Sequence, residues 1–222
     1  STPLYSSAAS DVYKRQAISL TLLSPSSQPH KLPENVRYVH LPVLKNNVHP
    51  AQLDRRNYAS FCRRFEKATT SYLESLHNQW PSPSSFAVLS NDICEGINFK
   101  RVAAMGIPIT TIFHVDVVDF FSRIYLGTKE GPPLRLVKFF RWAEGTYLAK
   151  LFPDVLRLVF EKQASCIRYS SKIVVPSHSM QHVLKRCYPE DVAGKTSIVP
   201  WGSWEDSTSD TCLLYTSDAA DE

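Results

Sequence analysis

Polar side chains follow three apolar runs of the sequence, at the point where each run ends. These residues are Asn91, Asp92, His114, Asp116, Ser177 and His178. Amide groups donate to and accept from hydroxyl groups, and carboxylates accept from them. An imidazole can donate to a hydroxyl or stabilise charge that develops during a reaction. The residue types therefore favour a site for a hydroxylated ligand.

Four of these residues also have a structural interpretation. Asn91 or Asp92 can cap the free backbone N–H groups of the helix that follows. His114 can be a histidine whose hydrogen bonds serve the fold alone. Ser177 is best explained as a helix N-cap, with a second role toward a ligand.

The sequence does not favour a metal site or a phosphate-binding loop. His178 and His182 have helical i, i+4 spacing, but no Glu completes an H-E-x-x-H pattern and no paired Cys is present. With 7 glycines in the chain, no G-x-G-x-x-G, G-x-x-x-x-G-K-[ST] or G-x-S-x-G pattern occurs.

The elements that position these residues alternate between strand and helix. Strands are predicted within residues 17–24, 36–43, 86–90, 107–115, 172–177 and 196–202. Helices are predicted over 55–77, 97–105, 118–126 and 179–188, and over 134–169 with a break at Pro153. This alternation predicts an α/β fold, a Rossmann-like parallel sheet with helices on both faces. Ligands of such sheets bind at the carboxyl ends of the strands.

The helix predicted over Arg55–His77 is amphipathic and basic. Its apolar residues advance by three or four positions, and Arg63, Arg64 and Lys67 point mostly away from them. A basic amphipathic helix can dock on anionic lipid, and the alternative is a solvated outer face.

The two ends of the chain are related through their coding DNA. One short DNA sequence encodes "SSAASDVYKRQ" (residues 6–16), and its reverse complement encodes "CLLYTSDAADE" (residues 212–222). We interpret residues 1–16 and 212–222 as translated sequencing-adaptor scars, which leaves residues 17–211 as a piece of a longer gene.

Composition excludes some classes of protein. The 222 residues carry a net charge of +4, without the dense basic stripe that is typical of nucleic-acid binding. Cys62, Cys94, Cys166 and Cys187 form no C-x-x-C pair, which favours free thiols in a reducing compartment. No apolar stretch reaches the roughly 20 residues that span a bilayer.

Three segments in order resemble a known family. "FAVLSNDICEGINFKRVAAMGIPITTIFHVDV", "KIVVPSHSMQHVLKRCYPE" and "KTSIVPWG" are similar to the N-terminal domain of GT-B retaining glycosyltransferases of family four. The resemblance implies that residues 17–202 are a Rossmann-like acceptor-side domain, and that 203–211 begin the hinge to a donor-binding domain. Trp201 departs from the Asn that is usual at the family's hinge.

The resemblance implies a retaining hexosyltransferase, with a nucleoside diphosphate sugar as donor substrate and no further cofactor or metal. His114 matches the family's strand-end histidine and would be catalytic, with Asn91, Asp92, Asp116 and Ser177 as substrate contacts. A carbohydrate or lipid-linked acceptor, no nucleic acid, a cytoplasmic location and peripheral membrane contact are expected. The paired catalytic Glu residues belong to the second domain, so this chain alone would be inactive.

Two alternatives remain open from the sequence. One is another sugar-nucleotide enzyme, such as an epimerase, which would need a dinucleotide fingerprint upstream. The other is a non-catalytic Rossmann-like binding or scaffold domain. It would lack the carboxylate pair downstream.

Overall fold

The chain is an α/β protein built on parallel strands. The computed structural model describes residues 19–26, 32–44, 52–82, 85–91, 96–114, 118, 134–143, 146–147 and 154–200. The strands in this part are β1 (Leu20–Ser24), β2 (Val36–His40), β3 (Val88–Ser90), β4 (Ile109–Ile112), β5 (Lys172–Val175) and β6 (Thr196–Ile198). Every predicted strand segment contains one of them, so the predicted α/β class is confirmed.

The described strands form two separate ladders. β1 pairs with β2, and the other four lie in the order β3-β4-β5-β6, with every pair parallel. Thr111 of β4 lies opposite Ser90 of β3 on one side and Ile173 of β5 on the other. Because the strands are parallel and in near register, their carboxyl ends meet at one edge of the four-stranded sheet.

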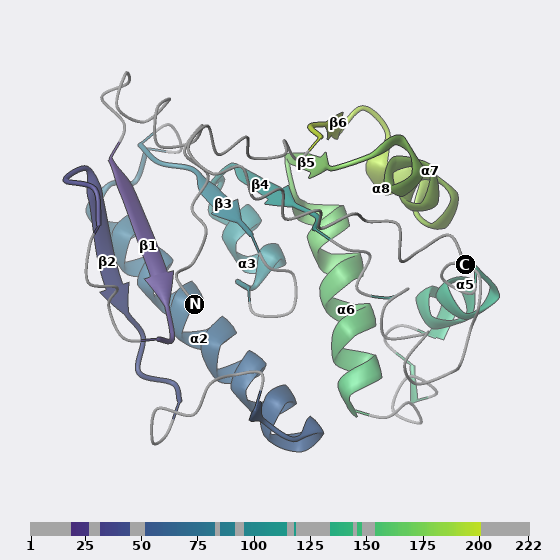
Figure 1. Cartoon of the computed structure of the whole chain (residues 1–222), viewed down its shortest axis with the longest axis horizontal. Helices are drawn as coiled ribbons and strands as arrows, with labels where there is room; N and C mark the ends of the chain where they lie inside the picture. Colours follow the sequence, from purple (N-terminus) through teal and green to yellow (C-terminus); the bar gives the residue numbers. More distant parts are fainter. Residues whose placement is uncertain are drawn as a thin grey trace, which may run out of the picture.

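The helices lie between consecutive strands and flank the sheets (Figure 1). They are α2 (Arg55–Gln79), α3 (Phe99–Ala104), α5 (Leu134–Ala143), α6 (Asp154–Tyr169), α7 (His178–Cys187) and α8 (Pro189–Val192). α6 begins directly after Pro153, where a break was predicted. Gly106, with a φ of 77°, follows α3 in a left-handed conformation that glycine adopts without strain.

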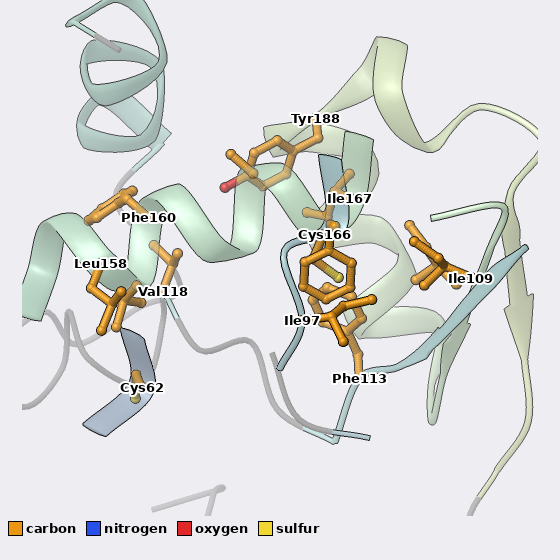
Figure 2. Packing of buried hydrophobic residues seen from close by; sticks show 14 of the residues in the cluster. Cys62, Ile97, Ile109, Phe113, Val118, Leu158, Phe160, Cys166, Ile167 and Tyr188 are labelled. Atoms are coloured by element: carbon orange, nitrogen blue, oxygen red, sulfur yellow. The ribbon is translucent and has the colours of Figure 1, made fainter. Parts of the chain in front are cut away.

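α6 supplies much of the core beneath the four-stranded sheet. Figure 2 shows Leu158, Phe160, Cys166 and Ile167 of this helix among the buried side chains. The Phe160 ring stacks on Phe140 of α5 with centroids 4.7 Å apart. Full burial of one such side chain stabilises the fold by about 1.5–3 kcal/mol. Thus α6 packs against α5 within the same hydrophobic core that includes the sheet.

α2 packs with α3 and α6 through its apolar stripe. Phe61 and Phe65 of the predicted stripe are buried and their rings stack at 5.9 Å. The helix starts at the predicted residue, because the Asp54 carboxylate accepts a 2.9 Å hydrogen bond from the Asn57 backbone N–H. No helix in the described ranges is long and apolar enough to cross a membrane.

Some predictions lie outside the described residues. They concern the two terminal scars, the hinge segment at residues 203–211 with Trp201 before it, most of the helix predicted over 118–126, and Cys94. The predicted free thiols are confirmed for the three described cysteines, Cys62, Cys166 and Cys187, which are all buried.

Candidate functional site

Two of the predicted site residues meet at the carboxyl edge of the four-stranded sheet. Asn91 follows β3 and His114 lies two residues beyond β4, so the parallel pairing of these strands brings them to the same edge. The distance between His114 Nε2 and Asn91 Oδ1 is 2.8 Å, and both residues are exposed. The predicted recurrence of polar groups at strand ends thus corresponds to a real contact here.

The contact has a defined hydrogen-bond direction. An amide oxygen only accepts, so the imidazole donates its Nε2–H to Asn91 Oδ1. The contact brings an imidazole and a primary amide together at this edge of the sheet. Both residue types can form hydrogen bonds with a ligand rich in oxygen atoms.

Ser177 lies at the carboxyl end of the neighbouring strand, β5, and caps α7. Its hydroxyl oxygen accepts a 3.2 Å hydrogen bond from the Met180 backbone N–H. The predicted N-cap is therefore confirmed, and the residue shares the edge on which Asn91 and His114 lie. Within the described ranges no group of three or more His, Cys, Asp or Glu side chains is arranged to hold a metal ion.

Asp92 and Asp116 lie outside the described residues, so their predicted roles stay predictions. The capping alternative for Asn91 and Asp92 is wrong for α3. Asn98 is the N-cap of that helix, and its side-chain oxygen accepts a 3.0 Å hydrogen bond from the Arg101 backbone N–H. The helix begins nearly two turns later than such a cap would require.

A buried ionic contact that the sequence interpretation missed holds the segment in front of α3. Lys162 of α6 is 5% exposed, forms a salt bridge with Glu66 of α2, and donates a 3.3 Å hydrogen bond to the Ile97 carbonyl. Asn98 Nδ2 donates to Glu66 Oε1 at 2.9 Å. Lys162 continues the apolar spacing of Val155 and its neighbours. A lysine at such a position is the sequence signal that could have indicated a buried ion pair.

Two threonines of α2 reinforce the same segment. Thr70 Oγ1 accepts a 3.0 Å hydrogen bond from the Asn98 backbone N–H, and Thr69 Oγ1 lies 3.5 Å from the Gly96 carbonyl oxygen. Both threonines are buried. The chain that leaves the strand-end site at Asn91 is therefore fixed again at residues 96–98 by α2 and α6.

A buried polar cluster behind β4 carries no nucleophile. The hydroxyl oxygens of Thr111 and Ser170 lie 2.8 Å apart, with Cys166 Sγ 3.9 Å from Ser170. Burial raises the pKa of the Cys166 thiol to about 12, which outweighs the opposing effect of these hydroxyls. The thiol stays protonated at neutral pH, and a thiol is a poor nucleophile. This cluster therefore serves the fold.

Two surface hollows lie along α2. One, of about 430 Å³, lies between α2 and residues 42–44, which follow β2. The other, of about 280 Å³, lies where α2, α3 and α6 meet, and includes Lys162 and Glu66. Asn91 and His114 are not among the residues that line either hollow. The strand-end pair is therefore separate from both of these hollows.

None of the protein families, curated proteins or solved structures compared with the chain matches it.

Proposed function

We propose that this chain is the acceptor-side domain of a retaining glycosyltransferase that uses a nucleoside diphosphate sugar. The observation that carries the proposal is the 2.8 Å contact between His114 and Asn91 at the carboxyl edge of a parallel sheet. Parallel α/β sheets bind ligands at this edge. The family resemblance of residues 85–202 supplies the reaction class.

The chemistry of sugar transfer explains why these residue types suit the site. As the bond to the leaving diphosphate breaks, the sugar carbon gains positive charge and the diphosphate gains negative charge. Catalysis then depends on positioning the acceptor hydroxyl and on stabilising these charges. In the proposal His114 contacts the transferred sugar or the acceptor hydroxyl, and Asn91 orients the histidine ring and donates to the acceptor.

The test uses the full-length protein and compares His114→Ala with His182→Ala. His182 is an exposed histidine on α7 and is a matched control. Release of nucleoside diphosphate from UDP-, GDP- and ADP-hexoses reports turnover. Loss of one well-placed polar group should lower kcat by about 10²–10³-fold. Turnover at the wild-type level in His114→Ala would contradict the catalytic role of His114.

The further features of the proposal follow the same reaction class. The acceptor is a carbohydrate or a lipid-linked carbohydrate, the protein works in the cytoplasm, and no cofactor beyond the donor substrate is needed. Product analysis by anomeric NMR separates the two stereochemical outcomes. An inverted product would contradict the retaining mechanism while leaving sugar transfer intact.

A non-catalytic binding domain is the second candidate function. Its support is that Asn91 and His114 are both exposed at the carboxyl edge of the sheet, where parallel sheets bind ligands. In that case the intact protein would bind oligosaccharides through this edge without releasing nucleoside diphosphate. Glycan-array binding that His114→Ala abolishes, in a protein without turnover, would identify this function.

A further inference from the structure

The larger hollow combines an apolar wall with two cations. Four residues of α2 line it, at positions 64, 67, 68 and 71. This i, i+3, i+4, i+7 spacing places them on one stripe of the helix. The rest of the lining comes from residues 42–44, which lie shortly after the carboxyl end of β2.

The cations of this lining come from α2, and the apolar residues come mainly from residues 42–44. Pro42, Val43, Leu44 and Ala68 are apolar, and the charged side chains are those of Arg64 and Lys67, both exposed. Among the described lining residues none is acidic. Arg64 donates from Nε to the Ser60 carbonyl at 3.4 Å, a weak contact at the limit of hydrogen-bond geometry.

The neighbouring basic residue of α2 differs in its surroundings. Arg63 is held by Asp154, with a 3.0 Å hydrogen bond from Nη1 to Oδ2. The smaller hollow, where Arg63 lies, also contains Glu66, Glu161 and Lys162, so its charges are mixed. An anion is therefore attracted to the Arg64–Lys67 stripe and not to the Arg63 side of the helix.

We infer that the hollow between α2 and residues 42–44 binds an amphiphile with a phosphate headgroup. A phosphate monoester carries a charge of about −1.5 to −2 at neutral pH, which matches two cations better than a carboxylate does. The phosphate contacts Arg64 and Lys67, and the first part of the apolar chain lies against Val43, Leu44 and Ala68. The inference does not depend on the proposed sugar transfer.

The test measures binding of dihexanoyl phosphatidic acid, below its micellar concentration, to the full chain by titration calorimetry. Dihexanoyl phosphatidylcholine tests the need for net negative charge, and inorganic phosphate tests the need for the apolar chain. Wild-type protein should bind the phosphatidic acid at least about tenfold more tightly than the phosphatidylcholine, the effect of one lost charged hydrogen bond. It should also bind it at least about tenfold more tightly than inorganic phosphate, which lacks the apolar contacts with Val43, Leu44 and Ala68.

The variant Arg64→Gln/Lys67→Gln should bind phosphatidic acid at least about tenfold more weakly than wild type. Its matched control is Lys172→Gln/Arg186→Gln, which removes two exposed cations from β5 and α7. Equal losses in both variants would show non-specific charge attraction and overturn the inference. So would inorganic phosphate binding as tightly as phosphatidic acid.

A second variant guards against a folding defect, and vesicles separate the sources of the lipid. Ser71→Glu places a carboxylate on the stripe without removing a cation and should also weaken binding. Circular dichroism confirms that each variant is folded. Co-sedimentation with phosphatidylcholine vesicles containing phosphatidic acid, if lost in the same variants, identifies a membrane lipid. Binding of the monomeric compound alone identifies a soluble amphiphile, and binding to neither overturns the inference.

Discussion

Replacing Lys162 by Met tests the buried ionic contact that fixes the segment beyond the strand-end site. The ammonium group bonds to Glu66 and to the Ile97 carbonyl, and Lys162 is 5% exposed. Methionine keeps a flexible chain of similar length but removes both contacts. Glu66 would then lie against the apolar end of methionine, with 24% of its side chain exposed.

The expected cost follows from these contacts. Each hydrogen bond from a charged donor contributes about 1.5–3 kcal/mol. The extra apolar surface that methionine buries offsets about 1 kcal/mol of this loss. The partial exposure of Glu66 reduces the cost further, because water can solvate its carboxylate. We therefore expect Lys162→Met to lower the free energy of unfolding by about 2–4 kcal/mol, near the lower end of the cost of breaking a buried pair.

Guanidinium-induced unfolding followed by far-UV circular dichroism measures this change. Lys100→Met, an exposed lysine on α3, is the control and should shift stability by about 0.5 kcal/mol or less. Adding Glu66→Gln to Lys162→Met keeps an oxygen that accepts from Asn98 but removes the unpaired charge. This double variant should recover to within about 1 kcal/mol of wild type. Equal stability of the two single lysine variants, or no recovery in the double variant, would refute the reasoning.

Three further predictions concern single residues. Arg63 donates hydrogen bonds to Asp154 and holds the pKa of that carboxyl below its ordinary 3.8. The pair therefore stabilises the fold above pH 3.8, and this stabilisation is lost as the pH falls through the lower pKa of the folded state. Asp154→Asn should therefore lower the free energy of unfolding by about 1 kcal/mol or less at pH 7, because both side chains are about half exposed. Below about pH 4 the stability of this variant should depend less on pH than that of the wild type. Cys166, whose pKa burial raises to about 12, should resist iodoacetamide at pH 8 in the native protein and react in guanidinium, as peptide mass spectrometry would show. Ser177→Ala should cost about 1 kcal/mol through the lost α7 cap, and a thermal melt unchanged from wild type would contradict the capping role.

The sequence predicted the elements well because their causes are local. The apolar spacing along α2, the proline before α6 and the serine before α7 each act on residues within a few positions. The cap of α3 was the local feature that the sequence did not identify. The helix was predicted to begin at residue 97, whereas it begins at Phe99 and Asn98 is its cap.

The sequence by itself determined that strands alternate with helices and that polar residues follow the strands. Tertiary structure alone decided which of them meet. Asn91 and His114 are 23 residues apart and become neighbours because β3 and β4 pair in parallel. Lys162 reaches Ile97 across 65 residues because α6 packs beside α3. Side-chain periodicity is set by the geometry of a single element, whereas these contacts depend on strand order and helix packing, which the burial of the whole core selects.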